Sequence, residues 1–267
     1  MLTEILGKGG ALCKEARSGR IRCPLIIRPT SEDAVTGQIV QTLRVLNSRW
    51  WLPDLLNTAL GTRRFRRQFH RDLSIEPWVN MPPYPRELLP WTEGSTQVDI
   101  VITYENPPTT VFIEAKYGSD VARTTTNGDG AHGYPADQIL RNIRVGLLAC
   151  GYFDRGGSLF ESPPRQFVQI LLAPKGGHPL IGRYRDPDHL RRSIPHADRL
   201  ADLPRSPFVG ELSFGDIMKC VQGRAAFLTR AERQAAEDLR RYLEFKLSRA
   251  PRGSGVDRHP IEDAQCS

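Results

Sequence analysis

Apolar residues recur along residues 30–46 at the spacing of an amphipathic helix. Each is three or four positions from the next, so all of them share one helical face. They are Val35, Ile39, Leu43 and Leu46. Thr30 or Ser31 can cap the first turn, where the acidic residues that follow suit the helix dipole. The pattern predicts a helix as the first clear element.

Residues 97–118 alternate between apolar and polar positions on both sides of a proline turn, which predicts a β-hairpin. Residues 65–78 also show even spacing. Phe65 and Phe69 would fit a helix as well, but we expect a strand from about Phe65 to Trp78.

The rest of the chain continues the alternation of helices and strands. Residues 136–153 have an apolar helical face, and residues 167–174 read as a short buried strand. Residues 175–210 are basic and interrupted by proline. Thr229 and Glu232 form a capping-box pattern at the start of a further helix, one side of which carries Leu239, Tyr242 and Leu243.

The order helix, strand, hairpin, helix, strand predicts an α/β fold with a central mixed β-sheet flanked by helices. We expect one domain over residues 1–249. Its core spans about residues 30–174, and residues 175–249 form an accessory helical region packed onto it. Residues 250–267 read as a disordered tail.

The chain of 267 residues carries a formal net charge of +7, which favours a polyanionic partner such as nucleic acid. The alternative interpretation is simply a charged surface. The five cysteines are odd in number and lack metal-ligand spacing, so we expect reduced thiols and a cytoplasmic location. We expect no membrane association, because no stretch approaches the roughly 20 apolar residues of a membrane span.

Charged residues interrupt both strands of the hairpin. With the turn centred on Pro107 and Pro108, Asp99 faces Lys116 and Val101 faces Glu114. The α-carbons of Asp99 and Glu114 are then diagonal neighbours roughly 7 to 8 Å apart on one face. A turn of odd length would send the two carboxylates to opposite faces.

Two carboxylates at that separation can reach one small cation, and oxygen ligands suit Mg²⁺ or Mn²⁺. Such an ion, with the Lys116 ammonium beside it, suits hydrolysis of a phosphodiester. The alternative is a solvated strand face on which Asp99 and Lys116 form an ordinary ion pair.

Two further polar residues have helical contexts. Glu32 falls within the apolar stripe of the first predicted helix, where a carboxylate would face the core, although stabilisation of the helix dipole explains it too. Gln138 begins the helix after the hairpin. It could hold a water or a phosphate, or be an ordinary polar position at a helix start.

The ordered set Glu32, Asp99, Glu114-Ala115-Lys116 and Gln138 resembles the PD-(D/E)xK nuclease superfamily, which has the restriction-endonuclease-like fold. The resemblance covers about residues 30–174. It implies that Asp99, Glu114 and the main-chain carbonyl of Ala115 bind Mg²⁺, and that Lys116 assists the attacking water.

The resemblance also implies that Glu32 contacts the metal or its water, and that Gln138 belongs to the catalytic set. Asn142 stands where one exonuclease-like subgroup has tyrosine, which argues against that subgroup. The residues expected to contact nucleic-acid phosphates are Lys116, Ser119, Arg63, Arg64, Arg66 and Arg67. For any one of these arginines, a solvated surface position is the alternative.

The sequence therefore favours a Mg²⁺-dependent DNA endonuclease of restriction, repair or phage-defence type. An RNase or exonuclease could use the same site, and a non-catalytic module binding nucleic acid or protein is a further alternative. Cutting both strands with one site per chain would require a homodimer. No nucleotide-binding glycine loop is recognisable, so ATP use or target specificity would come from a partner protein.

Overall fold

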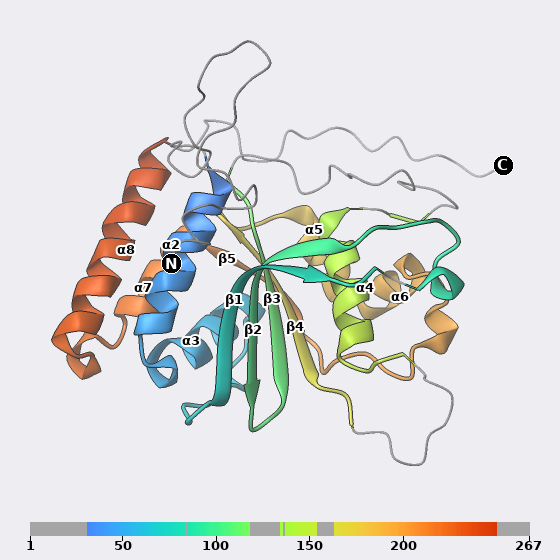
Figure 1. Ribbon diagram of the computed structural model, residues 1–267, viewed down its shortest axis with the longest axis horizontal. Helices are drawn as coiled ribbons and strands as arrows, with labels where there is room; N and C mark the ends of the chain where they lie inside the picture. The colour runs from blue at the N-terminus through green and yellow to red at the C-terminus, as the bar shows by residue number, and fades with distance from the viewer. Residues whose placement is uncertain (1–30, 84, 118–133, 136, 154–162, 250–267) are drawn as a thin grey trace, which may run out of the picture.

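A computed structural model describes residues 31–83, 85–117, 134–135, 137–153 and 163–249. Its centre is a five-stranded sheet in the order β1-β2-β3-β4-β5 (Figure 1). The strands are β1 (Arg71–Met81), β2 (Thr96–Glu105), β3 (Thr109–Ala115), β4 (Gln166–Ala173) and β5 (Val209–Ser213). The β1-β2-β3 pairings are antiparallel and the β3-β4-β5 pairings are parallel. The expected α/β architecture with a mixed sheet is confirmed.

Helices cover both faces of the sheet (Figure 1). One face packs against α2 (Glu32–Val45), α3 (Ser48–Leu60), α7 (Phe214–Gln222) and α8 (Arg230–Arg249). The other packs against α4 (Gln138–Ala149), α5 (Pro179–Arg185) and α6 (Pro187–Ser193). Short 3₁₀ turns complete the chain: η3 (Arg86–Leu88), η5 (Ala197–Arg199) and η6 (Ala225–Phe227). Two hydrophobic clusters, one on each side, hold these layers together.

Helix α2 forms where the apolar spacing places it. The Ser31 side chain caps it by accepting a hydrogen bond from the Ala34 amide at 3.1 Å. Val35, Ile39 and Leu43 are buried in the core. The predicted helix is confirmed, and its first turn points toward the end of β3, as the contact between Glu32 and Tyr117 shows.

The strand expected over Phe65–Trp78 is wrong in its first half. The chain is irregular over residues 65–70, and β1 begins only at Arg71. Helix α3, which the sequence did not predict, ends before this segment. The Asn47 side chain caps α3, and Gly61 ends it in the left-handed conformation (φ 64°). Buried Trp51, Leu52, Leu55, Leu56 and Ala59 supply its apolar face. The even spacing of Phe65 and Phe69 does not report a strand, because Phe69 is 84% exposed in an irregular segment.

Residues 175–249 contribute to the central sheet as well as to its helices. Strand β5 pairs in parallel with β4, from Gln169 opposite Val209 to Ala173 opposite Ser213. Pro179 and Pro187 each occupy the first position of a short helix, which proline favours because its backbone angle is already helical. The residues 175–210 therefore fold into α5, α6 and β5, rather than forming only an accessory helical layer.

Helix α8 begins with the expected capping box. The Thr229 amide donates to Glu232 at 2.7 Å, and the Glu232 amide donates to the Thr229 hydroxyl at 3.3 Å. Leu239 and Leu243 are fully buried on its inner side. The expected tail, residues 250–267, lies outside the described residues. Among the helices that are described, none is both long and apolar enough to cross a bilayer.

Candidate active site

The β2–β3 hairpin pairs two residues away from the expected register. Tyr104 lies opposite Thr109 and Val101 opposite Phe112, so the prediction that Val101 faces Glu114 is wrong. A two-residue hairpin turn needs positive φ angles, which proline cannot adopt. The loop therefore widens to four residues and uses Asn106 at φ 64°.

A shift of two residues keeps every side chain on its expected face. Continuing the register from the pair Ile100 and Ile113 places Asp99 directly opposite Glu114, and not opposite Lys116 as expected. The Asp99 carboxylate accepts a hydrogen bond from the Ala115 amide at 3.0 Å. Asp99 and Glu114 are 2% and 0% exposed, so the two acids are buried side by side and not on a solvated strand face.

Glu114 is held from two directions. Its Oε2 accepts a hydrogen bond at 2.9 Å from the side-chain amide of Asn142, a residue of α4. Its Oε1 lies 2.8 Å from the Lys116 ammonium. The Asn142 carbonyl in turn accepts from the Thr96 hydroxyl at 3.2 Å. These contacts fix the orientation of the carboxylate.

Lys116 lies immediately after β3, where its amide donates to the Leu172 carbonyl of β4 at 2.8 Å. Its ammonium is 2.8 Å from Glu114 and 3.9 Å from Glu32. Burial lowers the pKa of Lys116, but the nearby charges of Glu114, Asp99 and Glu32 outweigh it and raise the pKa above the ordinary 10.5. Lys116 is therefore a fixed cation at neutral pH.

Glu32 reaches the same cluster from the first turn of α2. Its Oε1 accepts a hydrogen bond from the Tyr117 amide at 2.9 Å, and its side chain is 27% exposed. The structure thus brings together Glu32, Asp99, Glu114 and Lys116, as the sequence predicted, around the end of β3.

Helix α8 supports this cluster from behind. The Tyr117 hydroxyl donates to the Lys246 carbonyl at 2.6 Å, and the Lys246 ammonium donates to the Ser31 carbonyl at 3.3 Å. That ammonium also lies 4.9 Å from the centre of the Tyr117 ring. Sequence reasoning missed Lys246, because nothing local links it to a residue 215 positions earlier.

Asn142, and not Gln138, is the α4 residue that contacts the acids. Gln138 is half-buried at the start of α4, and its side chain makes no hydrogen bond to Asp99, Glu114 or Lys116. Asn142 lies four residues later on the same helix and is fully buried. The available signal was a polar side chain one helical turn after Gln138, on a helix otherwise apolar on that face.

Replacing Asn142 with alanine is expected to destabilise the fold by about 1–3 kcal/mol, because Glu114 loses a buried hydrogen-bond donor. Chemical denaturation measures this loss. A stability of Asn142→Ala equal to wild type would contradict the role given to this contact.

No family model, curated protein or solved structure matches the chain. The chemistry of the site therefore has to be judged from its own geometry.

The donor set suits a hard divalent cation. Three carboxylates gather around one ammonium, and all of their donor atoms are oxygens, as Mg²⁺ prefers. No group of three or more His, Cys, Asp or Glu side chains is arranged as a metal cage within the described ranges. Mg²⁺ needs no such cage, because it keeps several waters and commonly uses one or two protein carboxylates. Asp99 and Glu114, opposite each other on neighbouring strands, meet that requirement.

The arginines expected to grip nucleic acid lie elsewhere. Arg64 and Arg66 border a cavity beside Tyr104, five residues along β2 from Asp99, or roughly 16 Å. Arg63 is exposed on the same loop, and Arg67 pairs with Asp54 at 3.4 Å. The structure does not bring this group together with the acids. Ser119 lies outside the described residues.

Proposed function

We propose that this chain is a Mg²⁺-dependent DNA endonuclease with a restriction-endonuclease-like core. The observation that carries the proposal is the buried cluster of Asp99, Glu114 and Lys116, with Glu32 beside it, where β2 and β3 meet the start of α2. Burying charged groups costs free energy, and clusters of buried charges of this kind are typical of functional sites.

The order of the elements supports the same proposal. The chain runs from α2 through β1, β2 and β3 to α4 and β4, with α3 added between α2 and β1; apart from α3, this is the helix, strand, hairpin, helix, strand order expected for that fold. Strand β4 lies parallel to β3, and α4 connects them. This connection places Asn142 against Glu114.

Magnesium, when bound by Asp99, Glu114 and the Ala115 carbonyl, supplies an acidified water and neutralises charge on the phosphate. Lys116 stabilises negative charge that develops on the phosphate, because its ammonium is held in place before the substrate arrives. Asn142 orients Glu114, and Glu32 helps to position Lys116.

The test is cleavage by purified protein with Mg²⁺, Mn²⁺ or EDTA. The substrates are supercoiled plasmid, linear duplex, single-stranded DNA and RNA. We expect nicking of the closed circle with either metal and none with EDTA. Cleavage of linear ends or RNA alone would favour an exonuclease or an RNase with the same residues. Binding of DNA without cleavage under every condition would overturn the proposal and favour a non-catalytic module.

A further inference from the structure

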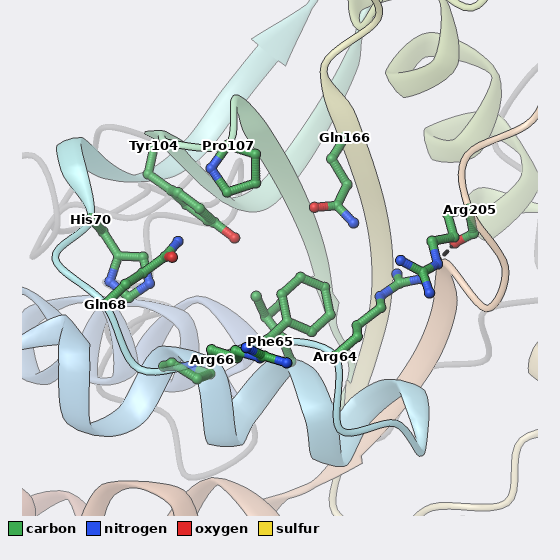
Figure 2. Close-up of a pocket in the computed structure, with 11 residues that line it drawn as sticks. Arg64, Phe65, Arg66, Gln68, His70, Tyr104, Pro107, Gln166 and Arg205 are labelled. Atoms are coloured by element: carbon green, nitrogen blue, oxygen red, sulfur yellow. Dashed lines mark hydrogen bonds between the residues drawn. The ribbon is translucent and has the colours of Figure 1, made fainter.

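A second polar feature lies at the turn end of the sheet. A cavity of about 250 Å³ opens between the loop after α3, the β2–β3 turn, the start of β4 and the segment before β5 (Figure 2). Its polar lining includes Arg64, Arg66, Gln68, His70, Gln166 and Arg205. It lies roughly 16 Å along β2 from the acidic cluster, so it is a separate site.

The cavity is strongly cationic. Three arginines line it, and none of its lining residues is an aspartate or glutamate. Two acids lie on neighbouring elements, and both pair with arginines outside the lining. Asp54 of α3 pairs with Arg67 and Arg224. Glu105 of β2 pairs with Arg165. The positive charge inside the cavity is therefore not neutralised by its own walls.

Arg64 is fixed in place by the backbone around it. Its guanidinium donates to the carbonyls of Arg205 at 2.7 Å and Pro207 at 2.8 Å, and lies 4.9 Å from the centre of the Phe65 ring. Figure 2 shows Arg64 and Arg205 next to each other at one end of the cavity. Burial, and then the charge of Arg205, lower the pKa of Arg64. Two cations kept this close repel each other, and a bound anion would relieve the repulsion.

The remaining walls are aromatic and polar. His70 is 6% exposed, bonds Ser48 through Nδ1 at 3.0 Å, and packs edge-on against Tyr104 at 4.9 Å between ring centres. In Figure 2, Gln68 and Gln166 lie on either side of Tyr104 and Pro107. Aromatic rings and side-chain amides suit a planar heterocycle with hydrogen-bonding edges.

We propose that this cavity binds a nucleoside phosphate, either free or at the end of an oligonucleotide. Arg66 and Arg205 hold the phosphate, since arginine offers paired donors that match its oxygens, and the charge of Arg64, whose donors bind backbone carbonyls, adds to the attraction. Phe65, which is only partly buried, faces the base. At about 250 Å³ the cavity is slightly smaller than the roughly 300 Å³ at which small-molecule sites begin, which limits the ligand to no more than one nucleotide. This inference does not depend on the proposed nuclease activity.

Binding is measured by titration calorimetry with the full chain in EDTA, which keeps the acidic cluster free of metal. The probes are inorganic phosphate, a nucleoside, the matching nucleoside monophosphate, and an oligonucleotide with a 5′-phosphate or a 5′-hydroxyl. We expect the monophosphate to bind more tightly than either the nucleoside or inorganic phosphate. Tighter binding of the 5′-phosphorylated oligonucleotide than of the free nucleotide identifies nucleic-acid ends as the source, and the reverse identifies free nucleotides.

Arg66→Ala and Arg205→Ala are expected to weaken binding at least about tenfold, the effect of losing one charge-assisted contact. Both residues are exposed, so the fold should persist, which circular dichroism checks. Arg230→Ala is the control, because Arg230 is exposed at the start of α8 and is not in the cavity lining. Absence of binding by every phosphate probe at millimolar concentration, or equal binding by all three variants, would overturn the proposal.

Discussion

Lys116→Ala is expected to reduce metal-dependent nicking at least about 100-fold, the usual effect of removing one preorganised group that stabilises transition-state charge. The Lys116 ammonium is held 2.8 Å from Glu114 and 3.9 Å from Glu32, so no other described cation replaces it at that position. Plasmid nicking at saturating Mg²⁺ measures the loss. Lys219→Ala is the control, since Lys219 is 83% exposed on α7.

The pH dependence of the wild type gives a second check. A lysine with a raised pKa in the folded state keeps its charge throughout the neutral range, and contributes stability that is fully present below the ordinary value of 10.5. That contribution is lost only as the pH rises through the raised value. Activity should therefore not fall through loss of this charge between about pH 7 and pH 9. If the Lys116→Ala variant nicked plasmid as fast as the wild type, the acidic cluster would be excluded as the catalytic site.

Gly210→Ala is expected to be the most destabilising small change in the sheet, by about 3 kcal/mol, in the upper range for overpacking. A methyl group on Gly210 would lie 2.2 Å from the Ala59 carbonyl oxygen and 2.7 Å from its carbon. That carbonyl belongs to α3 and is held by Arg185 at 3.0 Å, so it cannot move aside freely. The change therefore forces β5 and α3 apart.

Thermal unfolding should show a fall of roughly 6–12 °C for a loss of that size in a chain of this length. Gly182→Ala provides the contrast, because an added methyl group there meets nothing within 4 Å and the residue lies within α5. Alanine in an open helical position should be neutral or stabilising by up to about 1 kcal/mol. Equal unfolding temperatures for the two variants would contradict the close approach of β5 to α3.

Sequence periodicity located α2, the hairpin, α4 and α8, and a continuous apolar run located β4, which is buried on both faces. It placed Asp99 and Glu114 on a shared face even with the wrong register, since an error of two residues preserves the face. It did not locate α3 or β5. The aromatic residues after α3 imitate a strand, and β5 is a short segment whose strand character depends on its pairing with β4.

The roles of the polar residues were harder to predict than the elements. Asn142 contacts Glu114 because α4 packs across the sheet at that level, which no local pattern reports. Arg63, Arg64, Arg66 and Arg67 were expected to contact nucleic-acid phosphates because they are basic. The position of these arginines depends on where β1 enters the sheet. It places them at the end of the sheet opposite the acidic cluster.

The contact of α8 with Tyr117 and Ser31 has a consequence for how the protein matures. The ribosome must synthesise α8 before Lys246 can form its hydrogen bonds with Ser31, at the start of α2, and with Tyr117. Until then the carboxylates at the end of β3 lack the support that these contacts give to Tyr117 and the start of α2. We therefore expect the proposed site to reach its final geometry only after α8 has been synthesised and has packed against α2.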